Sequence, residues 1–237
     1  MEGRKWLEKL RRSFTGKRPL VPHGDWPRWY GDYWQQAHQQ LPPDLLLRDA
    51  PVVVLDAETT GLDTKADRMV SLGGLRVYGN SIHLQEKFEA YLPTPTGLES
   101  TAAVAIHGIV PNSQRYVYSD ELTLLKELLE YLGGAIVVGH HIGFDVAVIN
   151  QSLERHGAGP LLNRTVDTAH LAKRLRPSGY WTPQGDYALD TLAKRYNIPL
   201  SDRHTALGDC YITGVLWLKL LTRLAIKLGH DLRVSDL

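Results

Sequence analysis

The pattern of apolar positions changes at residue 51, where a run rich in β-branched residues, PVVVLDAE, predicts a buried strand. Residues 68–79 and 81–92 predict two further strands on either side of a turn at Gly79 and Asn80. The chain after residue 50 is therefore expected to begin with three strands in succession.

Helical periodicity begins in residues 120–134, where five leucines recur at the spacing of one helix face. These are Leu122, Leu125, Leu128, Leu129 and Leu132. Asp120 can cap the start of this helix and Gly133 can end it.

Beyond this helix, short strands alternate with helices. Strands are predicted at residues 135–140 and 164–169, and helices at residues 144–157, 170–175, 189–197 and 206–227. Residues 176–188 predict a loop. The element order βββαβαβαα predicts an α/β domain with a mixed sheet flanked by helices.

The first 50 residues follow a different pattern. Residues 1–14 place Trp6, Leu7, Leu10 and Phe14 at helical spacing, which predicts an amphipathic helix. Residues 23–34 are dense in Trp and Tyr, with Pro and Gly that break regular structure, and residues 41–51 read as a connector. The aromatic residues either stack on nucleic-acid bases or pack this extension onto its own domain, and we favour packing.

Composition narrows the class of protein. A chain of 237 residues has room for one sizeable domain and an appendage. No apolar run approaches the roughly 18 residues of a membrane-spanning helix, and no secretory signal is evident. Cys210 is the single cysteine, which excludes an intramolecular disulfide and a Cys-rich zinc site, so we expect a cytoplasmic protein.

Charge is unevenly distributed along the chain. The net charge is +1, while residues 1–20 hold seven Lys or Arg and two Glu, a net of 7 − 2 = +5. The remainder is therefore 1 − 5 = −4. A basic arm of this kind contacts nucleic acid or acidic membranes, or forms the solvated face of a helix, and charge alone leaves these alternatives open.

Two carboxylates stand at the end of the first predicted strand. Asp56 and Glu58 are two residues apart, so their side chains share one face of the strand. Carboxylates forced together repel one another unless a cation lies between them. Hard oxygen ligands suit Mg²⁺ or Mn²⁺, and strand ends are where open α/β folds place ligands. The pair is a candidate metal site; the alternative is a solvated strand end or a loop cap.

Three further acids and one histidine lie near other element ends. Asp145 lies at a strand-to-helix junction and Asp167 near a strand end, where either residue could simply cap a helix. His204 precedes Asp209 by five residues, which on one helix would turn the two side chains apart. They converge only if His204 lies on a loop or first turn, for which residues 201–203 supply loop and cap residues.

These segments resemble the DEDD exonuclease superfamily in its His-containing branch, DEDDh. That branch includes the proofreading epsilon subunit of bacterial DNA polymerase III, RNase T, oligoribonuclease and TREX-type exonucleases. The matching motifs are LDAETTGL, HHIGFD and HTALGD, with weaker matches at VDT, LDTLAKRYNIP and AIHGI, and they span residues 51–225. His141 departs from the family, which usually has Asn there, and we expect a structural or substrate-proximal role for it.

The resemblance implies a ribonuclease H-like fold and a role for each matching residue. Asp56, Glu58 and Asp209 would hold one metal ion, and Asp56 with Asp145 a second, so that Mg²⁺ or Mn²⁺ ions act in pairs on a phosphodiester bond. His204 would be the general base.

The resemblance also implies how the substrate is held. The Thr60 backbone would take the terminal 3′-hydroxyl, Leu62 would wedge against the terminal base, and Ile106 and His107 would line the same pocket. Asp167 is interpreted as a helix cap, and Cys210 as a packed thiol.

The implied activity is 3′→5′ removal of nucleoside 5′-monophosphates from single-stranded 3′ ends, with DNA favoured over RNA. An RNA-trimming enzyme and a non-catalytic nucleic-acid-binding or scaffold subunit are the alternatives. We expect an N-terminal extension over residues 1–48, an exonuclease domain over 49–230 and a tail over 231–237. The extension could contact a replication or repair protein.

Overall fold

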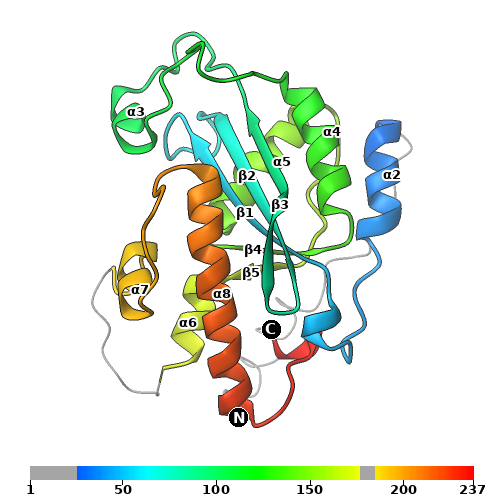
Figure 1. The fold of residues 1–237 in the computed structure, drawn as a ribbon. Helices are drawn as coiled ribbons and strands as arrows, with labels where there is room; N and C mark the ends of the chain where they lie inside the picture. The colour runs from blue at the N-terminus through cyan, green and yellow to red at the C-terminus, as the bar shows by residue number, and fades with distance from the viewer. Residues whose placement is uncertain (1–25, 177–184) are drawn as a thin grey trace, which may run out of the picture.

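A five-stranded mixed sheet forms the centre of the protein, whose computed structural model describes residues 26–176 and 185–237 (Figure 1). The strands are β1 (Val52–Thr59), β2 (Met69–Tyr78), β3 (Ser81–Tyr91), β4 (Ile136–Gly139) and β5 (Thr165–Asp167). Their order across the sheet is β3-β2-β1-β4-β5. β1, β2 and β3 pair antiparallel, whereas β4 pairs parallel with both β1 and β5. The predicted mixed sheet is confirmed.

Helices cover both faces of this sheet. They are α2 (Arg28–Ala37), α3 (Thr101–His107), α4 (Glu121–Leu132), α5 (Gly143–Arg155), α6 (Thr168–Arg174), α7 (Leu189–Arg195) and α8 (Ala206–Leu228). In Figure 1, α2, α4 and α5 lie on one side of the sheet and α6, α7 and α8 on the other. Among these helices, none combines the length with the hydropathy that a bilayer crossing demands.

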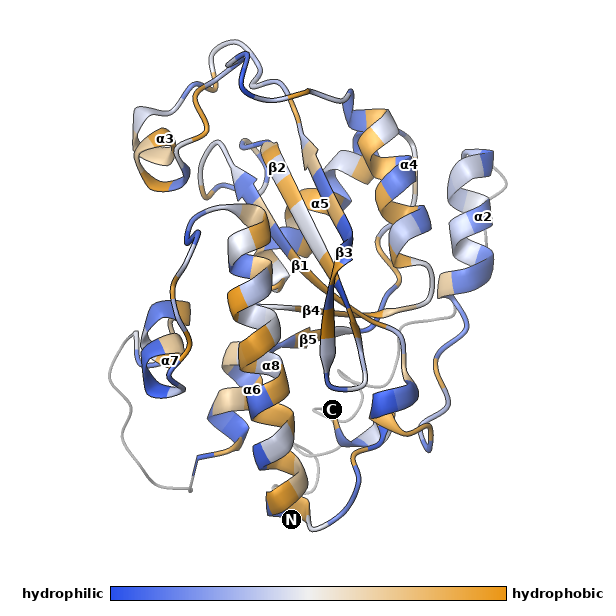
Figure 2. Cartoon of the chain, in the orientation of Figure 1, coloured by the Kyte–Doolittle hydropathy of each residue, from blue (hydrophilic) through white to orange (hydrophobic). Residues whose placement is uncertain are grey.

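Alternation along β1 explains the unbroken apolar run that predicts it. Val53 and Leu55 enter the core on the side of α4 and α5, whereas Val52 and Val54 enter the core on the side of α8. A strand with helices on both faces needs apolar residues at every position, not at every second one. Figure 2 shows the corresponding apolar stripes along the helices.

Helix ends follow the predicted capping only in part. Asp120 caps α4 by accepting from the Thr123 N–H at 3.0 Å, and Gly133 follows the last residue of that helix. Asp167 caps α6 by accepting from the Ala169 N–H at 2.8 Å. The cap of α8 is Thr205 rather than a residue of 201–203, because its hydroxyl accepts from the Gly208 N–H at 3.1 Å.

Two helices correct the sequence prediction. Residues 101–107 form α3, which the sequence pattern did not predict; Ser100 caps it and Gly108 ends it with φ of 69°. Residues 28–37 form α2 although Pro and Gly were expected to break this segment. Pro27 sits at the N-cap, where it costs no helical hydrogen bond, and Gly31 lies inside the helix with open space around it. The predicted helix at residues 1–14 and part of the predicted loop at 176–188 lie outside the described residues.

Aromatic residues of α2 pack into the core beside α4 and α5, as the packing interpretation predicts. Tyr30 and Tyr33 are 0% and 3% exposed. The Tyr30 hydroxyl donates to the Pro160 carbonyl at 2.6 Å, and the Tyr33 hydroxyl donates to Asn163 Oδ1 at 2.6 Å. Downstream, the Leu47 N–H donates to the Leu232 carbonyl at 2.8 Å, which joins this segment to the C-terminal residues.

Candidate active site

Three carboxylates meet at the C-terminal end of β1. One oxygen each from Asp56, Glu58 and Asp209 lie within 4.8 Å of one another. Asp56 and Glu58 come from one face of β1, as their spacing predicts, and Asp209 comes from the first turn of α8. The structure therefore brings together the three carboxylates that the resemblance assigns to one metal ion, and their role as ligands stays a prediction.

Two glycines allow close backbone packing at the start of α8, Gly73 against the sheet and Gly208 against the preceding loop. A Cβ atom on Gly73 of β2 would lie 2.6 Å from the Ala206 carbonyl carbon at the start of α8. A Cβ atom on Gly208 would collide with the Asp202 carbonyl oxygen. Because both obstacles are backbone atoms, a larger residue at Gly73 would push the start of α8 away from the sheet, and one at Gly208 would displace the start of α8 or the loop before it.

Asp145 lies beside this trio but outside the group of three. It is the third residue of α5 and not its N-cap, so the capping alternative is wrong for this residue. Its Oδ1 accepts from the Ala57 N–H at 2.8 Å, which ties α5 to β1 between the two strand carboxylates. Burial raises the pKa of Asp145 to about 7, and the charge of Glu58 adds to the shift.

The trio is electrostatically strained as a set. Burial raises the pKa of Asp56 well above its ordinary value, and repulsion from Asp145, Asp209 and Glu58 raises it further. Burial likewise raises the pKa of Glu58 to about 7, with Asp209 as the second cause. Burial also raises the pKa of Asp209. Such a site holds a proton or a cation in place of its full negative charge.

Arg203 is a residue of the site that the sequence reasoning missed. Its NH1 forms an ion pair with Asp209 Oδ2, and its Nε lies 2.6 Å from Asp190 Oδ1 of α7. The guanidinium also lowers the pKa values of Asp56 and Glu58. The sequence contains a signal for this residue. Arg203 directly precedes His204 and stands six residues before Asp209, so it lies on the loop that must bring His204 and Asp209 together.

His204 lies on that loop, immediately before α8, as the five-residue spacing requires. It has a φ of 67°, a left-handed conformation that histidine tolerates better than most residues. Its Nδ1 is 3.2 Å from Arg203 NH1. Because a guanidinium only donates, Nδ1 accepts in this contact and carries the lone pair of the neutral ring.

His107 at the end of α3 faces the same region. Its Nδ1 accepts from the Ile109 N–H at 3.0 Å, and its Nε2 is buried without a hydrogen-bond partner among the described residues. Burial lowers the pKa of His107, and the proximity of His204 lowers it further. These contacts place His107 near His204, and its expected role in lining the substrate pocket stays a prediction.

The turn after β1 carries two more of the predicted substrate contacts. Asp67 organises this turn by accepting from the Thr60 hydroxyl at 2.7 Å and from the Asp63 N–H at 2.8 Å. A Cβ atom on Gly61 would lie 2.5 Å from the Asp67 carboxylate. The Thr60 N–H donates to the Arg68 carbonyl at 2.9 Å, so the Thr60 carbonyl is the backbone group that could accept from a 3′-hydroxyl.

Two of the predicted contact residues are large apolar side chains in solvent. Leu62 is 87% exposed and Ile106 is 60% exposed. Exposure of a leucine on a tight turn and of an isoleucine on a short helix leaves both free to touch a ligand. Their contact with a base stays a prediction.

His141, the position where the motif departs from the family, adopts a φ of 57°. Its N–H lies 3.2 Å from Asp167 Oδ1, the same oxygen that caps α6. Asn and His are both enriched in the left-handed conformation, so the exchange preserves the backbone that the turn requires. Asp167 therefore acts as a cap and turn support.

Cys210 follows Asp209 but points away from any nucleophilic role. It is 0% exposed, and its Sγ lies 3.2 Å from the Gly73 carbonyl oxygen. Burial raises the pKa of the thiol well above its ordinary value, which keeps it protonated. The packed-thiol interpretation agrees with this environment.

The acidic cluster fits a divalent cation. Asp209 Oδ1 is buried and, among the described residues, has no hydrogen-bond partner, although its other oxygen pairs with Arg203. An unpaired buried carboxylate oxygen is costly unless a cation satisfies it. The donors are all carboxylates, which favours hard cations.

Comparison with known proteins gives the family. The family model described as exonuclease, RNase_T, matches residues 53–216. The chain is 32% identical over 184 residues to the DNA polymerase III PolC-type of Staphylococcus aureus, an alignment that covers 77% of this chain. It spans only 12% of the length of that relative.

Solved structures give the fold. Exonuclease I of E. coli in complex with a dT13 oligonucleotide superposes with a TM-score of 0.65 at 23% identity, over 76% of this chain and 43% of that one. The ExoI/SSB-Ct complex gives a TM-score of 0.58 at 21% identity, over 76% and 42%. These matches confirm the ribonuclease H-like fold. With the family match over residues 53–216, the chain belongs to the DEDDh family of 3′→5′ exonucleases and is an enzyme of that class.

Proposed function

We propose that this enzyme hydrolyses phosphodiester bonds at single-stranded 3′ ends, with two divalent ions, Mg²⁺ or Mn²⁺, and releases nucleoside 5′-monophosphates. The observation that carries the proposal is the convergence of Asp56, Glu58 and Asp209 within 4.8 Å, with His204 on the adjoining loop. These carboxylates have raised pKa values, and one buried oxygen lacks a hydrogen-bond partner within residues 26–176 and 185–237, which is the environment of a cation site.

Each residue then has a defined task. Asp56, Glu58 and Asp209 hold the first ion, and Asp56 with Asp145 places the second. The ions supply Lewis-acid stabilisation of the charge that develops on the phosphate and leaving oxygens. His204 takes a proton from the attacking water at Nδ1, the nitrogen that carries the lone pair, after the Arg203 N–H withdraws from it.

The substrate end is held by the turn after β1 and by α3. The Thr60 carbonyl accepts from the terminal 3′-hydroxyl, and Leu62 wedges against the terminal base. Ile106 and His107 close the same pocket from α3. The exposure of Leu62 and Ile106 supports this proposal, because a wedge must be accessible to the base that it touches.

DNA is the favoured substrate. The relative at 32% identity is a DNA polymerase, and structural neighbours were solved with dT13 and dA16 oligonucleotides. An RNA-trimming activity is the alternative, since these motifs fix the bond that is cut and not the sugar.

We further propose that residues 49–230 are the exonuclease domain, with residues 231–237 as a tail. We also propose that residues 1–48 include a contact site for a replication or repair protein.

The test is release of mononucleotides from 5′-labelled DNA and RNA strands of matched sequence, with Mg²⁺ or Mn²⁺ and with EDTA. Asp56→Asn and His204→Ala should each reduce the rate by at least about 100-fold, since general-base catalysis alone contributes 10²–10⁴-fold. Asp202→Asn is the matched control, because Asp202 is exposed on the His204 loop at a φ of 57° that Asn also adopts.

Full activity of either variant would overturn the assignment of these residues. Tight binding without metal and without turnover would instead favour the non-catalytic scaffold. Faster cleavage of RNA than of DNA would overturn the preference for DNA.

A further inference from the structure

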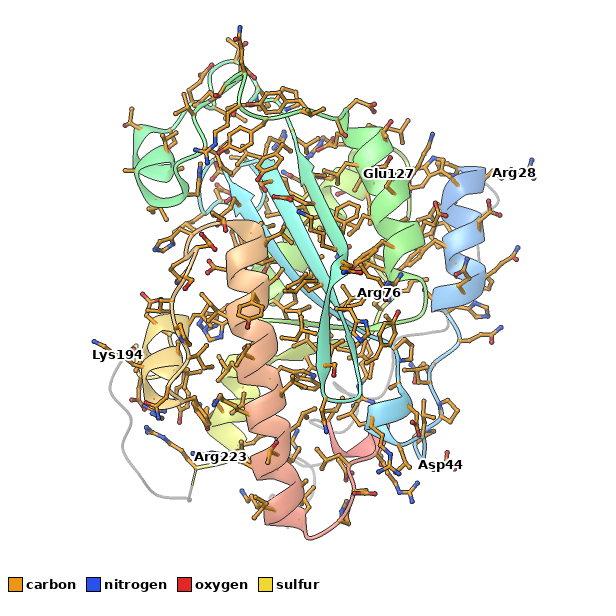
Figure 3. The ribbon with its side chains drawn as sticks, viewed as in Figure 1. Arg28, Asp44, Arg76, Glu127, Lys194 and Arg223 are labelled. Carbon is orange, nitrogen blue, oxygen red and sulfur yellow. The ribbon has the colours of Figure 1, made fainter. Side chains whose placement is uncertain are left out.

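A second polar surface lies away from the acidic cluster, where α6, α7 and α8 come together. A hollow of about 610 Å³ is lined there by Arg176 after α6, Arg195 of α7, and Arg223 and Lys227 of α8. We call this hollow, with the cations at its rim, the basic groove. Lys194 and Arg223 mark its position on the α7 side of the molecule in Figure 3.

Positive charge is concentrated around the basic groove. Seven cations belong to α6, to the residue Arg176 after it, to α7 and to residues 223–228 of α8: Lys173, Arg174, Arg176, Lys194, Arg195, Arg223 and Lys227. Residues 1–25 contribute seven Lys or Arg and three Asp or Glu, so residues 26–237 have a net charge of 1 − (7 − 3) = −3. A cluster of seven cations in a body of net negative charge creates a local positive potential that attracts anions.

The groove contains few acids to neutralise these cations. Asp186 pairs with Arg176 at 2.6 Å and with Arg195 at 2.5 Å, so one carboxylate serves two guanidinium groups. After Asp209, α8 carries no acidic residue. Lys227 Nζ donates to the Arg174 carbonyl at 2.8 Å, a neutral acceptor that leaves the charge in place.

The groove also has an apolar floor. Ile226 is 77% exposed, and Ala172, Leu175 and Tyr196 line the hollow. The Arg223 guanidinium lies 4.6 Å from the centre of the Tyr196 ring. Because Arg223 is exposed, a nucleobase can stack on the face of its guanidinium that points away from Tyr196, as bases stack on aromatic rings in single-strand binding sites.

The groove and the acidic cluster are joined by the same two helices. Asp209 and Arg223 are 14 residues apart on α8, which at 1.5 Å per residue is roughly 21 Å. Arg203 links Asp209 to Asp190 near the start of α7, and Arg195 ends that helix at the groove. A stacked strand rises about 3.4 Å per nucleotide, so roughly 21 Å between the acidic cluster and the groove corresponds to about six nucleotides. A more extended strand covers the same distance with fewer nucleotides.

We propose that the basic groove binds the phosphate backbone of the substrate strand, on the 5′ side of the nucleotide held at the acidic cluster. The proposal rests on the proposed exonuclease function. A nucleic-acid strand fits better than an acidic peptide because four of the seven cations are arginines, whose forks match phosphate, and because the rim combines them with apolar surface for bases.

The experiment compares short and long strands. The triple variant Lys194→Gln, Arg223→Gln and Lys227→Gln removes three exposed charges, in an Asp56→Asn background that prevents cleavage. Fluorescence anisotropy measures the Kd of a dinucleotide, which is too short to reach the groove, and of a 20-nucleotide DNA. We expect the 20-mer Kd to rise at least about tenfold, its salt slope to fall by about 2, and the dinucleotide Kd to stay unchanged.

The matched control is the triple variant Arg28→Gln, Lys87→Gln and Lys126→Gln, which removes three exposed charges from α2, β3 and α4. It should leave both Kd values unchanged. In the cleavage-competent background, both triple variants should hydrolyse the p-nitrophenyl ester of thymidine 5′-monophosphate at the unaltered rate, since this substrate cannot reach the groove.

An unchanged 20-mer Kd and salt slope in the groove variant would overturn the proposal. The same result with a loss of binding to poly-glutamate would assign the groove to an acidic protein segment and would equally overturn it. If the unsubstituted enzyme hydrolyses neither the ester nor any oligonucleotide, the proposed function itself fails, and the length-dependent binding still judges the groove separately.

Discussion

The buried carboxylates of the acidic cluster lower the stability of the folded protein, because they repel one another, and the same arrangement can bind a cation. Asp145 and Asp209 are 5% and 4% exposed, and Asp56 and Glu58 are partly buried beside them. Arg203 offsets part of this charge through Asp209. The remaining repulsion appears as raised pKa values, which connect the stability of the protein to pH and to metal.

Glu58 gives the residue-scale prediction. Its pKa is raised from the ordinary value of 4.5 to about 7 in the folded protein. Between these two pH values the folded protein keeps a proton on Glu58, whereas the unfolded chain has released it. The free energy of unfolding of the metal-free protein should therefore fall as pH rises from about 4.5 to about 7. Glu58→Gln should flatten this slope, measured by urea unfolding in EDTA.

Metal reverses the sign of this dependence. Divalent ions bind the deprotonated carboxylates, so Mn²⁺ affinity of the unsubstituted protein should rise over the same pH range and binding should release protons. Glu89→Gln, an exposed acid of β3, is the control and should keep the original slope. An identical slope in the Glu58→Gln variant would show that Glu58 has an ordinary pKa in the folded state.

At the scale of elements, the sequence predicts the strands and most helices but misses α2 and α3. Strong apolar periodicity marks α4 and α8 on its own. The alanine-rich α3 has only His107 buried, so its amphipathic signal is weak, and α2 is stabilised by tertiary packing of its tyrosines. The acids of the site were predictable because their motifs are local. The sequence places Arg203 beside His204, but only the fold shows that it pairs both with Asp209 and with Asp190 of α7.

Gly208 tests how α8 presents Asp209. In Gly208→Ala the added Cβ meets the Asp202 carbonyl, so the start of α8 must shift or the His204 loop must move. We expect Mn²⁺ affinity and cleavage rate to fall by about tenfold or more, with a loss of about 1–3 kcal/mol in unfolding free energy. Isothermal titration and urea unfolding measure the two effects.

Gly31→Ala is the control for this prediction. Gly31 lies inside α2 with open space around its Cα, so the change should raise stability by up to about 1 kcal/mol and leave metal affinity unaltered. Normal Mn²⁺ affinity in Gly208→Ala would show that the helix start tolerates the extra atom and does not fix Asp209.

At the scale of the whole molecule, the sheet divides the core into two halves that meet different parts of the chain. One half contains α4, α5 and the tyrosines of α2; the other contains α8, α7 and residues near the C-terminus such as Val234. Strand order β3-β2-β1-β4-β5 does not follow from apolar patterns alone, because pairing joins residues such as Val53 and Val137 that lie far apart in sequence. Long-range polar contacts then fix the pieces that flank the sheet.

Tyr33 is the clearest of these contacts. Its hydroxyl donates to Asn163 Oδ1 and accepts from the Leu162 N–H at 2.8 Å, while Asn163 Nδ2 donates to the Gly133 and Ala135 carbonyls. Tyr33→Phe leaves a buried acceptor and a part-buried donor unpaired, which should lower the unfolding free energy by about 1–3 kcal/mol. Thermal and urea unfolding measure this loss. Tyr78→Phe makes the same chemical change at a 40% exposed residue and should cost less than about 0.5 kcal/mol.

Mn²⁺ affinity separates stability from function in this comparison. Tyr33 contacts residues near the starts of β4 and β5, at the opposite end of these strands from Gly139 and Asp167, so its loss should leave the acidic cluster intact. A Tyr33→Phe protein as stable as Tyr78→Phe would mean that α2 docks without this network. A lower Mn²⁺ affinity would mean that the two halves of the core are coupled through the sheet. The coupling would run through β4, because α2 contacts the residues at the starts of β4 and β5, and β4 pairs with β1, the strand that ends at Asp56 and Glu58.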